Sequence, residues 1–226
     1  MSNAAALNVS DVVNRILVMA VRLHAEDEVG AMSQYARVML RKDIPDVLPA
    51  VLRHVSHFFM DAASARGRVR VLDLWVSLKL PRVYSEETIN KASNNGHVAI
   101  LERWVKSGLE PKYSHQAVDF ASRNGHVAML DWWIQSGFEF KYTERAIHWA
   151  SEKGHVAVLD WWVQSGLELM YFHWAIDRAS ENGHIKVLDW WAKSGLELMY
   201  SCDAIDKASG NGHAAVLEWW NESGLM

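Results

Sequence analysis

The chain has 226 residues, a formal net charge of -4, 50% hydrophobic residues and 22% charged residues. This composition is typical of a folded globular protein and excludes a disordered or collagen-like chain. The sequence pI near 6.2 argues against a nucleic-acid partner. The single cysteine excludes an internal disulfide framework. The apolar runs near the start are too short for a membrane span. We therefore expect a cytoplasmic protein, with the nucleus as an alternative, that binds neither nucleic acid nor membrane.

Residues 1–54 follow no internal period and are predicted to be helical around residues 9–24 and 28–41. One interpretation is a helical cap that closes the open end of the repeat array that follows. The other is a docking module, because the stretch NVSDVVNRILVMAV at residues 8–21 resembles the opening helix of F-box adaptor domains. That resemblance implies recruitment of a second protein, such as a ubiquitin-ligase subunit, although the Leu-Pro start and the later tryptophan of that family are absent.

From residue 55 onward the sequence repeats every 29 residues. A tyrosine, a Gly-His pair and a tryptophan mark each full copy, and a period between 20 and 50 residues is typical of a stacked repeat protein. The pairs are Gly96-His97, Gly125-His126, Gly154-His155, Gly183-His184 and Gly212-His213. The array begins with a degenerate copy at 55–83 and continues with 84–112, 113–141, 142–170, 171–199 and 200–226. Positions within a copy are called places, counted from the tyrosine.

Each copy is predicted to form two short helices. In the last copy, Ser201 at place two can cap the first helix, and places five, six, nine and ten form its apolar side. The alanine at place nine of every copy indicates a close approach between helices, and the glycine at place thirteen predicts a left-handed stop. The second helix is expected to turn places fourteen, seventeen, eighteen, twenty-one and twenty-two inward and to end at Gly224. No strand pattern of useful length occurs, so the fold class is all-α.

The repeated unit resembles the ankyrin repeat. The run A-S-x-N-G-H-x-x-V-L-x-W-W-x-x-S-G-L-E-L matches that family's pattern in register, at Ala179-Ser180, Gly183-His184, Val187-Leu188, Trp190-Trp191 and Gly195-Leu196-Glu197. The resemblance covers 55–226 and implies an ankyrin-like α-solenoid of stacked helix pairs that binds other proteins. Two features depart from the family: the opening Thr-Pro-Leu-His is absent, and the copy is shorter than the usual 33 residues. We therefore expect a plain turn in place of the protruding hairpin.

The five histidines at place fourteen suggest a metal site or a structural role. Equivalent residues in stacked repeats lie about 8–10 Å apart, which is too far for neighbouring imidazoles to share one zinc ion. We therefore interpret these histidines as structural, bonding backbone groups at the turn before the second helix. No set of nucleophile, base and oxyanion donor is recognisable, so the sequence predicts no catalytic residue, no metal, no cofactor and no enzyme activity.

The paired tryptophans have two different interpretations. Those at place twenty-one are predicted to be buried: Trp75, Trp104, Trp133, Trp162, Trp191 and Trp220. Those at place twenty either pack against the neighbouring repeat, which we favour, or form an aromatic ridge for a partner: Trp132, Trp161, Trp190 and Trp219. The acidic residue at place nineteen of every copy is interpreted as a solvated face, with a docking strip for a basic partner as the alternative.

A partner-binding surface is predicted where the copies differ. Places four, seven, eight and eleven of the first helix should point away from the packed side. In the middle copies these places and their neighbours carry aromatic and cationic residues, which is the composition of binding hot spots. The candidate partner-binding residues are Phe120, Arg145, His148, Trp149, Trp174 and Arg178. The alternative for the rings is packing between repeats.

The last copy keeps the apolar residues of the internal ones, and no further repeat in the sequence covers them. Terminal repeats usually turn a polar face outward. We therefore expect that this end contacts a second copy of the chain or that it marks a truncated longer array. The runner-up functions are a substrate-recruiting adaptor that uses the F-box-like segment and a structural or effector-type repeat protein.

Overall fold

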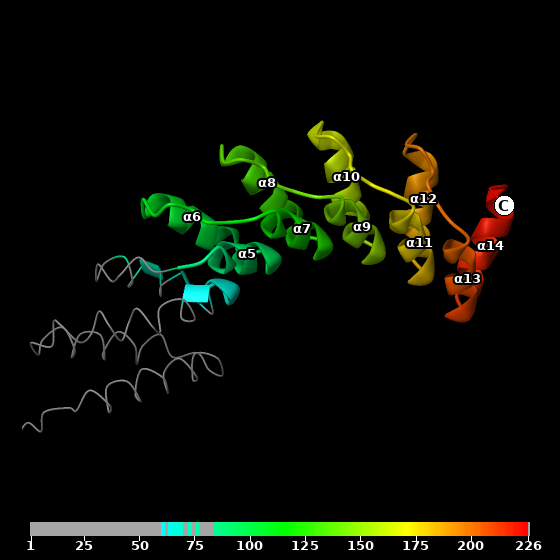
Figure 1. Ribbon diagram of the computed structural model, residues 1–226, viewed down its shortest axis with the longest axis horizontal. Coiled ribbons are helices and arrows are strands. Elements are labelled where there is room, and N and C mark those ends of the chain that lie inside the picture. The colour runs from blue at the N-terminus through cyan, green and yellow to red at the C-terminus, as the bar shows by residue number, and fades with distance from the viewer. Residues whose placement is uncertain (1–59, 62, 70–71, 74–75, 77–83, 226) are drawn as a thin grey trace, which may run out of the picture. The chain divides into compact units, whose positions relative to one another are not determined.

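The computed structural model describes residues 60–61, 63–69, 72–73, 76 and 84–225 (Figure 1). All regular secondary structure among these residues is helical, and no strand occurs in them, as the sequence predicts. The N-terminal cap, the F-box-like stretch and Trp75 lie outside the described residues, so the expectations for them stay predictions.

Each full copy contains a first and a second helix. The first helices are α5 (Glu87–Asn94), α7 (Gln116–Arg123), α9 (Arg145–Glu152), α11 (Trp174–Glu181) and α13 (Asp203–Gly210). The second helices are α6 (Val98–Lys106), α8 (Val127–Gln135), α10 (Val156–Ser165), α12 (Ile185–Lys193) and α14 (Ala214–Ser223). Helices this short are marginal in isolation, so their stability depends on packing against one another.

The chain divides into two compact units, and the division falls inside the 84–112 copy. One unit comprises Met1–Ala92 with Ala99–Tyr113, and the other comprises Ser93–Val98 with Ser114–Met226. In the second unit, α7, α9, α11 and α13 form one layer and α8, α10, α12 and α14 form the other (Figure 1). The first helices contact one another extensively, so α9 is covered by both α7 and α11. The second helices touch their neighbours less.

The glycine at place thirteen ends each first helix in the left-handed conformation, as predicted. Gly154 has a φ of 79°, and the amide that follows it, that of His155, donates to the carbonyl of Ala150 at 2.9 Å. The degenerate copy makes the same turn without a histidine. There Gly67 has a φ of 66°, and the Arg68 amide donates to Ala63 at 2.9 Å. The glycine therefore sets the turn, and the histidine beside it serves another purpose.

That purpose is to join one copy to the next. The Nε2 atom of His184 lies 2.8 Å from the carbonyl oxygen of Glu152, and that of His126 lies 3.1 Å from the carbonyl oxygen of Asn94. The predicted structural role is confirmed, but the carbonyl belongs to the end of the preceding first helix. Burial lowers the pKa of His155, which disfavours the charged form of its imidazole. Among the described residues, no group of three or more His, Cys, Asp and Glu side chains is placed to hold a metal ion.

The core is a ladder of buried indoles, as predicted. In the second unit each place-twenty-one tryptophan is at most 1% exposed and donates its Nε1 proton to the place-ten serine of the preceding copy. These bonds are Trp133 to Ser93 at 3.1 Å, Trp162 to Ser122 at 3.2 Å, Trp191 to Ser151 at 3.2 Å and Trp220 to Ser180 at 3.1 Å. The place-nine alanines are buried beside them, which confirms the close approach of the helices.

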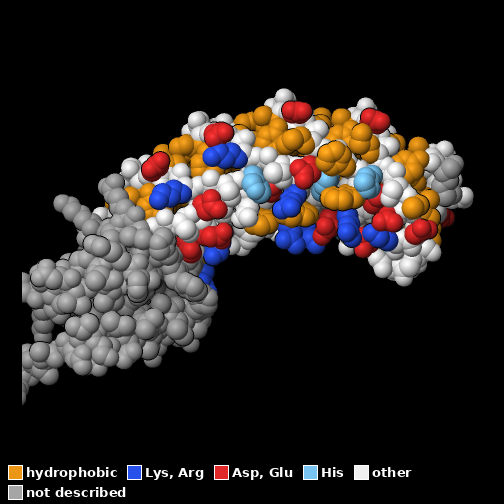
Figure 2. All heavy atoms as spheres, in the orientation of Figure 1, with side chains coloured by type: hydrophobic (Ala, Val, Ile, Leu, Met, Phe, Trp, Pro, Cys, Tyr) orange, Lys and Arg blue, Asp and Glu red, His pale blue; other side chains and the backbone are white. Residues whose placement is uncertain are grey.

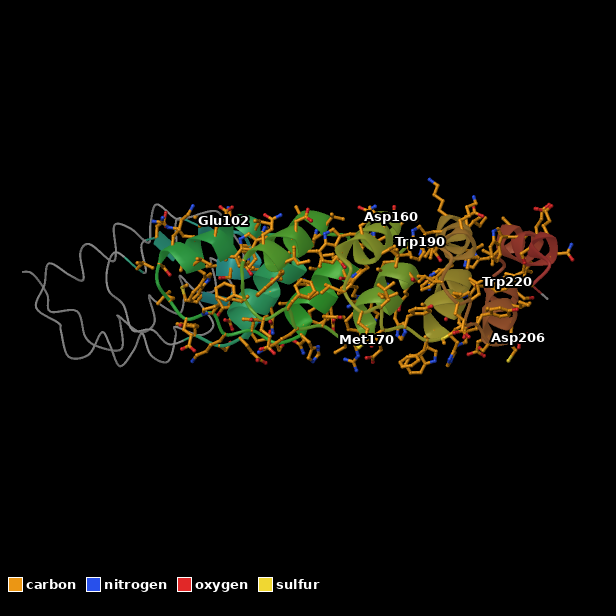
Figure 3. All side chains as sticks on the ribbon, turned by 90° about the horizontal axis from the view of Figure 1, so that it is seen from above. Glu102, Asp160, Met170, Trp190, Asp206 and Trp220 are labelled. Carbon is orange, nitrogen blue, oxygen red and sulfur yellow. The ribbon has the colours of Figure 1, made fainter. Side chains whose placement is uncertain are left out.

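Three of the four place-twenty tryptophans, all except Trp132, bind the preceding copy, as favoured. Their Nε1 protons go to the place-nineteen carboxylates: Trp161 to Asp131 at 2.7 Å, Trp190 to Asp160 at 2.6 Å and Trp219 to Asp189 at 2.8 Å. Figure 3 shows Asp160 and Trp190 side by side on the second-helix layer. The place-nineteen acids are therefore acceptors within the array and not only a solvated face.

One expectation for the second helix is wrong. Place twenty-two was predicted to face inward, yet Val105, Ile134 and Val163 are 48%, 41% and 43% exposed. The next residue along a helix is turned by 100°, and the buried indole at place twenty-one takes the inward direction. The aliphatic row therefore lies on the outer face of the second helices.

Candidate partner-binding surface

Place seven of the first helix is buried in every full copy except 200–226, which contradicts the expectation that it points outward. Asp119 and Asp177 are 1% and 3% exposed. Asp119 accepts the amide of Thr143 at 2.9 Å and its hydroxyl at 2.6 Å, and Asp177 binds Ser201 with the same two distances. Burial raises the pKa of Asp119, and its hydrogen bonds oppose that shift. Place seven is buried because a first helix is covered on two sides, by the helix before it and the helix after it.

The place-two hydroxyl has two roles. In addition to binding the preceding copy, Thr143 Oγ1 accepts the amide of Arg145 at 3.3 Å, and Ser201 Oγ accepts that of Asp203 at 3.2 Å. The hydroxyl thus accepts the first helical amide in these two copies, but it lies one residue before the N-cap position, which Glu144 and Cys202 occupy without a side-chain bond of their own. The shorter bonds, however, go across the junction to place seven, so this serine or threonine joins copies as well as starting a helix.

His148 replaces the aspartate at one junction, between the 142–170 and 171–199 copies. Its side chain is 5% exposed, and its Nε2 atom accepts the amide of Phe172 at 3.0 Å. Burial lowers the pKa of His148 to about 4. The negative charge of Glu144 opposes this shift, and the nearby His173 adds to it. The predicted exposure of His148 is wrong, because the imidazole is taken up by the junction. Phe172 has no hydroxyl to offer, so this junction lacks the second bond of the aspartate junctions.

Two large rings are in solvent at this junction. Phe172 is 54% exposed and Trp174 is 57% exposed, and no other aromatic side chain among the described residues is as open. The ring of His148 lies 5.9 Å from each of them, and His173 lies 5.7 Å from Trp174. We call His148, Phe172, His173 and Trp174 the Trp174 cluster. The sequence did signal Phe172, because every other full copy has serine or threonine at place two, but this residue was not among the candidates.

A second group of side chains lies on α7 and α9. The rings of Phe120 and Trp149 stack with centroids 5.5 Å apart and planes 13° from parallel, and both are half-buried. The guanidinium carbons of Arg123 and Arg145 lie 5.4 and 5.6 Å from the Trp149 ring centre. We call Phe120, Arg123, Arg145 and Trp149 the Trp149 cluster. The structure thus brings three of the predicted residues together and adds Arg123, whose place eleven was expected to face outward.

The charges around the two clusters differ. Arg178, the remaining candidate, is exposed and forms an ion pair with Glu181 on its own helix. Lys153 and Lys207 likewise pair with Glu152 and Asp203. In the space-filling view, hydrophobic side chains follow the upper edge, over α8, α10 and α12, with acidic side chains among them, and charged side chains of both signs lie along the lower edge, over the first helices (Figure 2). The first-helix surface therefore combines exposed rings with fixed charges.

Paired short helices that stack through a glycine turn, a histidine rung and a buried tryptophan rung define an ankyrin-like α-solenoid, as the resemblance implied. The chain is similar to a solved structure, the human ASB11 ankyrin repeat domain, with a TM-score of 0.59 and 14% sequence identity over 74% of this chain and 84% of that chain. Identity this low shows the fold alone. No protein-family model and no curated protein matches the sequence. No helix among the described residues is both long and apolar enough to cross a membrane.

Proposed function

We propose that this protein is a non-catalytic protein-interaction module whose protein partner binds the Trp149 cluster and the Trp174 cluster. The observation that carries the proposal is the exposure of Phe172 and Trp174, at 54% and 57%, in an array that buries or half-buries its other described Phe, Tyr and Trp rings. Exposed aromatic side chains with arginine beside them are the residues that dominate binding energy at protein interfaces. Both clusters lie on the same layer of first helices, so one partner surface can reach them.

The buried ionisable groups support a structural role for the interior. Asp119, His148 and Asp177 would be the natural candidates for acid–base chemistry, because each is buried and titratable. Each instead accepts the backbone amide of the following copy. A catalytic site needs such a group free to meet a substrate, so the proposal includes no enzyme activity and no cofactor. We place the protein in the cytoplasm.

The test removes the rings. Trp149→Ala with Trp174→Ala, used as bait in the native cell, should lose the partner that the natural chain recovers, and Trp174→Ala alone should weaken its recovery. The exposed pair Ile134→Ala with Val163→Ala, on the other layer, is the matched control and should leave recovery unchanged. Trp174 is mostly in solvent, so its replacement should shift thermal unfolding little. Unchanged recovery by the Trp174→Ala variant would rule out this surface.

We also propose that the 200–226 copy contacts a second copy of the chain. Asp206 and Ser209 are exposed there, whereas the equivalent Asp177 and Ser180 are buried and bind the next copy. Figure 3 shows Asp206 at the far end of the first-helix layer. Light scattering at high concentration should detect self-association that Asp206→Lys with Ser209→Glu removes, and a strict monomer would overturn this part.

The substrate-recruiting adaptor depends on residues 8–21, outside the described residues, and the structural or effector role is the third proposal.

A further inference from the structure

Arg123 and Arg145 differ from the other cations of the first-helix layer in having no acidic partner. Among residues 84–225, Lys91, Lys153, Arg178 and Lys207 on these helices each lie within 4.0 Å of a carboxylate oxygen. Arg123 and Arg145 have no carboxylate within that distance in the described part of the chain, and both guanidinium groups contact the same indole, that of Trp149. Two positive charges without an ion-pair partner among the described residues therefore lie around one indole, in a protein whose formal net charge is -4.

The ring holds the two guanidinium groups without using their hydrogen-bond donors. A cation over an aromatic face is attracted to the π-electrons, and the N–H groups at the guanidinium edge stay free to bind acceptors. Each guanidinium can bind a carboxylate through two parallel hydrogen bonds, which are stronger than those between neutral groups. The Trp149 cluster is thus arranged to bind two acidic groups at fixed positions.

The neighbouring copy supplies an apolar contact. Phe172 and Trp174 are exposed beside the buried, neutral His148, and the cations next to them, Arg178 and Lys207, are already paired. Adjacent first helices lie about 8–10 Å apart, so one short segment can span both clusters. Its acidic residues would face α7 and α9, and an apolar side chain would cover Trp174 on α11.

The ring contacts favour a protein segment over a nucleic acid. Proteins that bind single strands stack bases on open aromatic faces. The faces of the Trp149 ring are taken by Phe120 and the two guanidinium groups. Among the described Phe, Tyr and Trp rings, those of Phe172 and Trp174 are the most exposed, and no cation–π contact to them from Arg123 or Arg145 occurs in this part of the chain. The cationic part of the surface is therefore suited to carboxylates that approach the guanidinium edges.

We propose that this surface recognises an acidic segment of the partner protein in which Asp or Glu residues stand next to an aromatic or aliphatic residue. The acidic residues bind Arg123 and Arg145, and the apolar residue packs on Trp174. This inference rests on the proposed function and adds the chemistry of the partner to it.

The test selects ligands without assuming a sequence. The full chain is used to pan a random-peptide phage display library, and the selected peptides are synthesised and measured by fluorescence anisotropy. We expect enrichment of peptides with Asp or Glu beside an apolar residue, and binding that weakens as salt is raised. Arg123→Gln with Arg145→Gln should weaken binding at least about tenfold, or about 1.4 kcal/mol. Lys186→Gln with Lys193→Gln removes the same charge from α12 and should leave binding unchanged.

The outcomes separate the two proposals. Selected peptides that are neutral or basic, but that still require Trp174, would overturn the acidic segment and leave the interaction surface standing. Peptides that bind the Trp174→Ala variant and the double-arginine variant as tightly as they bind the natural chain would overturn both proposals. An absence of any enrichment would do the same. A single-stranded oligo-uridine that binds more tightly than the peptides, and that loses binding with the arginines, would overturn the choice of a protein partner. Thermal unfolding of each variant verifies that the array remains folded.

Discussion

Trp161 and Trp162 are adjacent in the chain and have different roles. Trp162 is 1% exposed and donates to Ser122, so its ring is part of the core. Trp161 is half-buried and donates to Asp131 at the outer edge of the second-helix layer. The difference follows from the 100° turn between successive helical residues, which takes one ring inward and the other along the surface.

Trp162→Ala should lower the free energy of unfolding by about 3–5 kcal/mol, the usual cost of truncating a large buried aromatic side chain. Trp161→Phe, which keeps a ring and removes the bond to Asp131, should cost only about 1 kcal/mol. Denaturant unfolding followed by circular dichroism measures both. A loss below about 1 kcal/mol for Trp162→Ala, the scale of an average mutation, would contradict the buried position.

His148 makes stability depend on pH. Its pKa is lowered from the ordinary value of 6.5 to about 4 in the folded chain, so between these values the unfolded chain binds the proton and the folded chain does not. The free energy of unfolding should therefore be highest above about pH 6.5 and should fall as the pH drops toward about 4, by about 3 kcal/mol at most from this residue.

His148→Asn is the comparison for this prediction, because an amide can accept the bond from Phe172 and does not titrate. Urea unfolding from pH 7.5 to 4 should show a steeper loss for the natural chain than for the variant. The subtraction removes the contributions of the other histidines, His155 included. Parallel curves for the two proteins would show that His148 is protonated as easily in the folded chain as in the unfolded one.

At the scale of the helix, the two glycine stops of a copy differ in what surrounds them. Gly154 and Gly166 have similar φ values, 79° and 71°. A Cβ on Gly154 would lie 3.0 Å from Nδ1 of His184, whereas a Cβ on Gly166 would meet no atom within 4 Å. The first glycine therefore provides both a backbone conformation and the space for the imidazole of the next copy.

Gly166→Ala should cost about 1 kcal/mol, because an L-residue is strained in the left-handed region. Gly154→Ala carries the same strain and also forces the imidazole of His184 to move, which should add about 1–3 kcal/mol. Thermal and denaturant unfolding of the two variants give the difference. Equal losses would mean that the histidine moves aside freely, and the contact between copies would then contribute little.

At the scale of the whole molecule, a small set of polar bonds recurs at the junctions between copies, with a variant at the junction of His148. The place-seven acceptor, the place-ten serine and the place-nineteen acid all bind groups of the following copy. A stack that depends on nearest-neighbour contacts gains stability from each junction. Within such a stack, the same substitution should have different effects at an internal junction and on the 200–226 copy.

Asp177→Asn should destabilise the array by about 1.5–3 kcal/mol, because it weakens two bonds to a buried charged acceptor. Asp206→Asn changes the equivalent residue of the 200–226 copy, whose side chain is exposed, and should stay within about 0.5 kcal/mol of the natural chain. Equilibrium unfolding in urea compares them. Similar effects at both positions would show that the aspartate acts within its own helix and not across the junction.

The candidate surface was predictable in part. Phe120, Arg145, Trp149 and Trp174 were identified because places four and eight vary among otherwise similar copies, and the structure leaves these side chains exposed or half-buried. The predicted exposure of His148 was wrong, because the pattern of one helix does not show that the first helix of the following copy covers its other side. Phe172 and Arg123 were missed, since their importance depends on the neighbouring side chains and not on their own helical position.

The sequence by itself determined the period, the helix pairs, the glycine stops and the buried indole ladder. These features are local or repeat identically, so spacing and residue type define them. Only the tertiary structure decided which polar residues bind across junctions and which rings stay in solvent. Those outcomes depend on pairs of residues 24 to 40 positions apart in the chain. At the junction of His148 with Phe172, an imidazole is paired with a residue that lacks a hydroxyl, so one bond is absent, and the rings of Phe172 and Trp174 are exposed there.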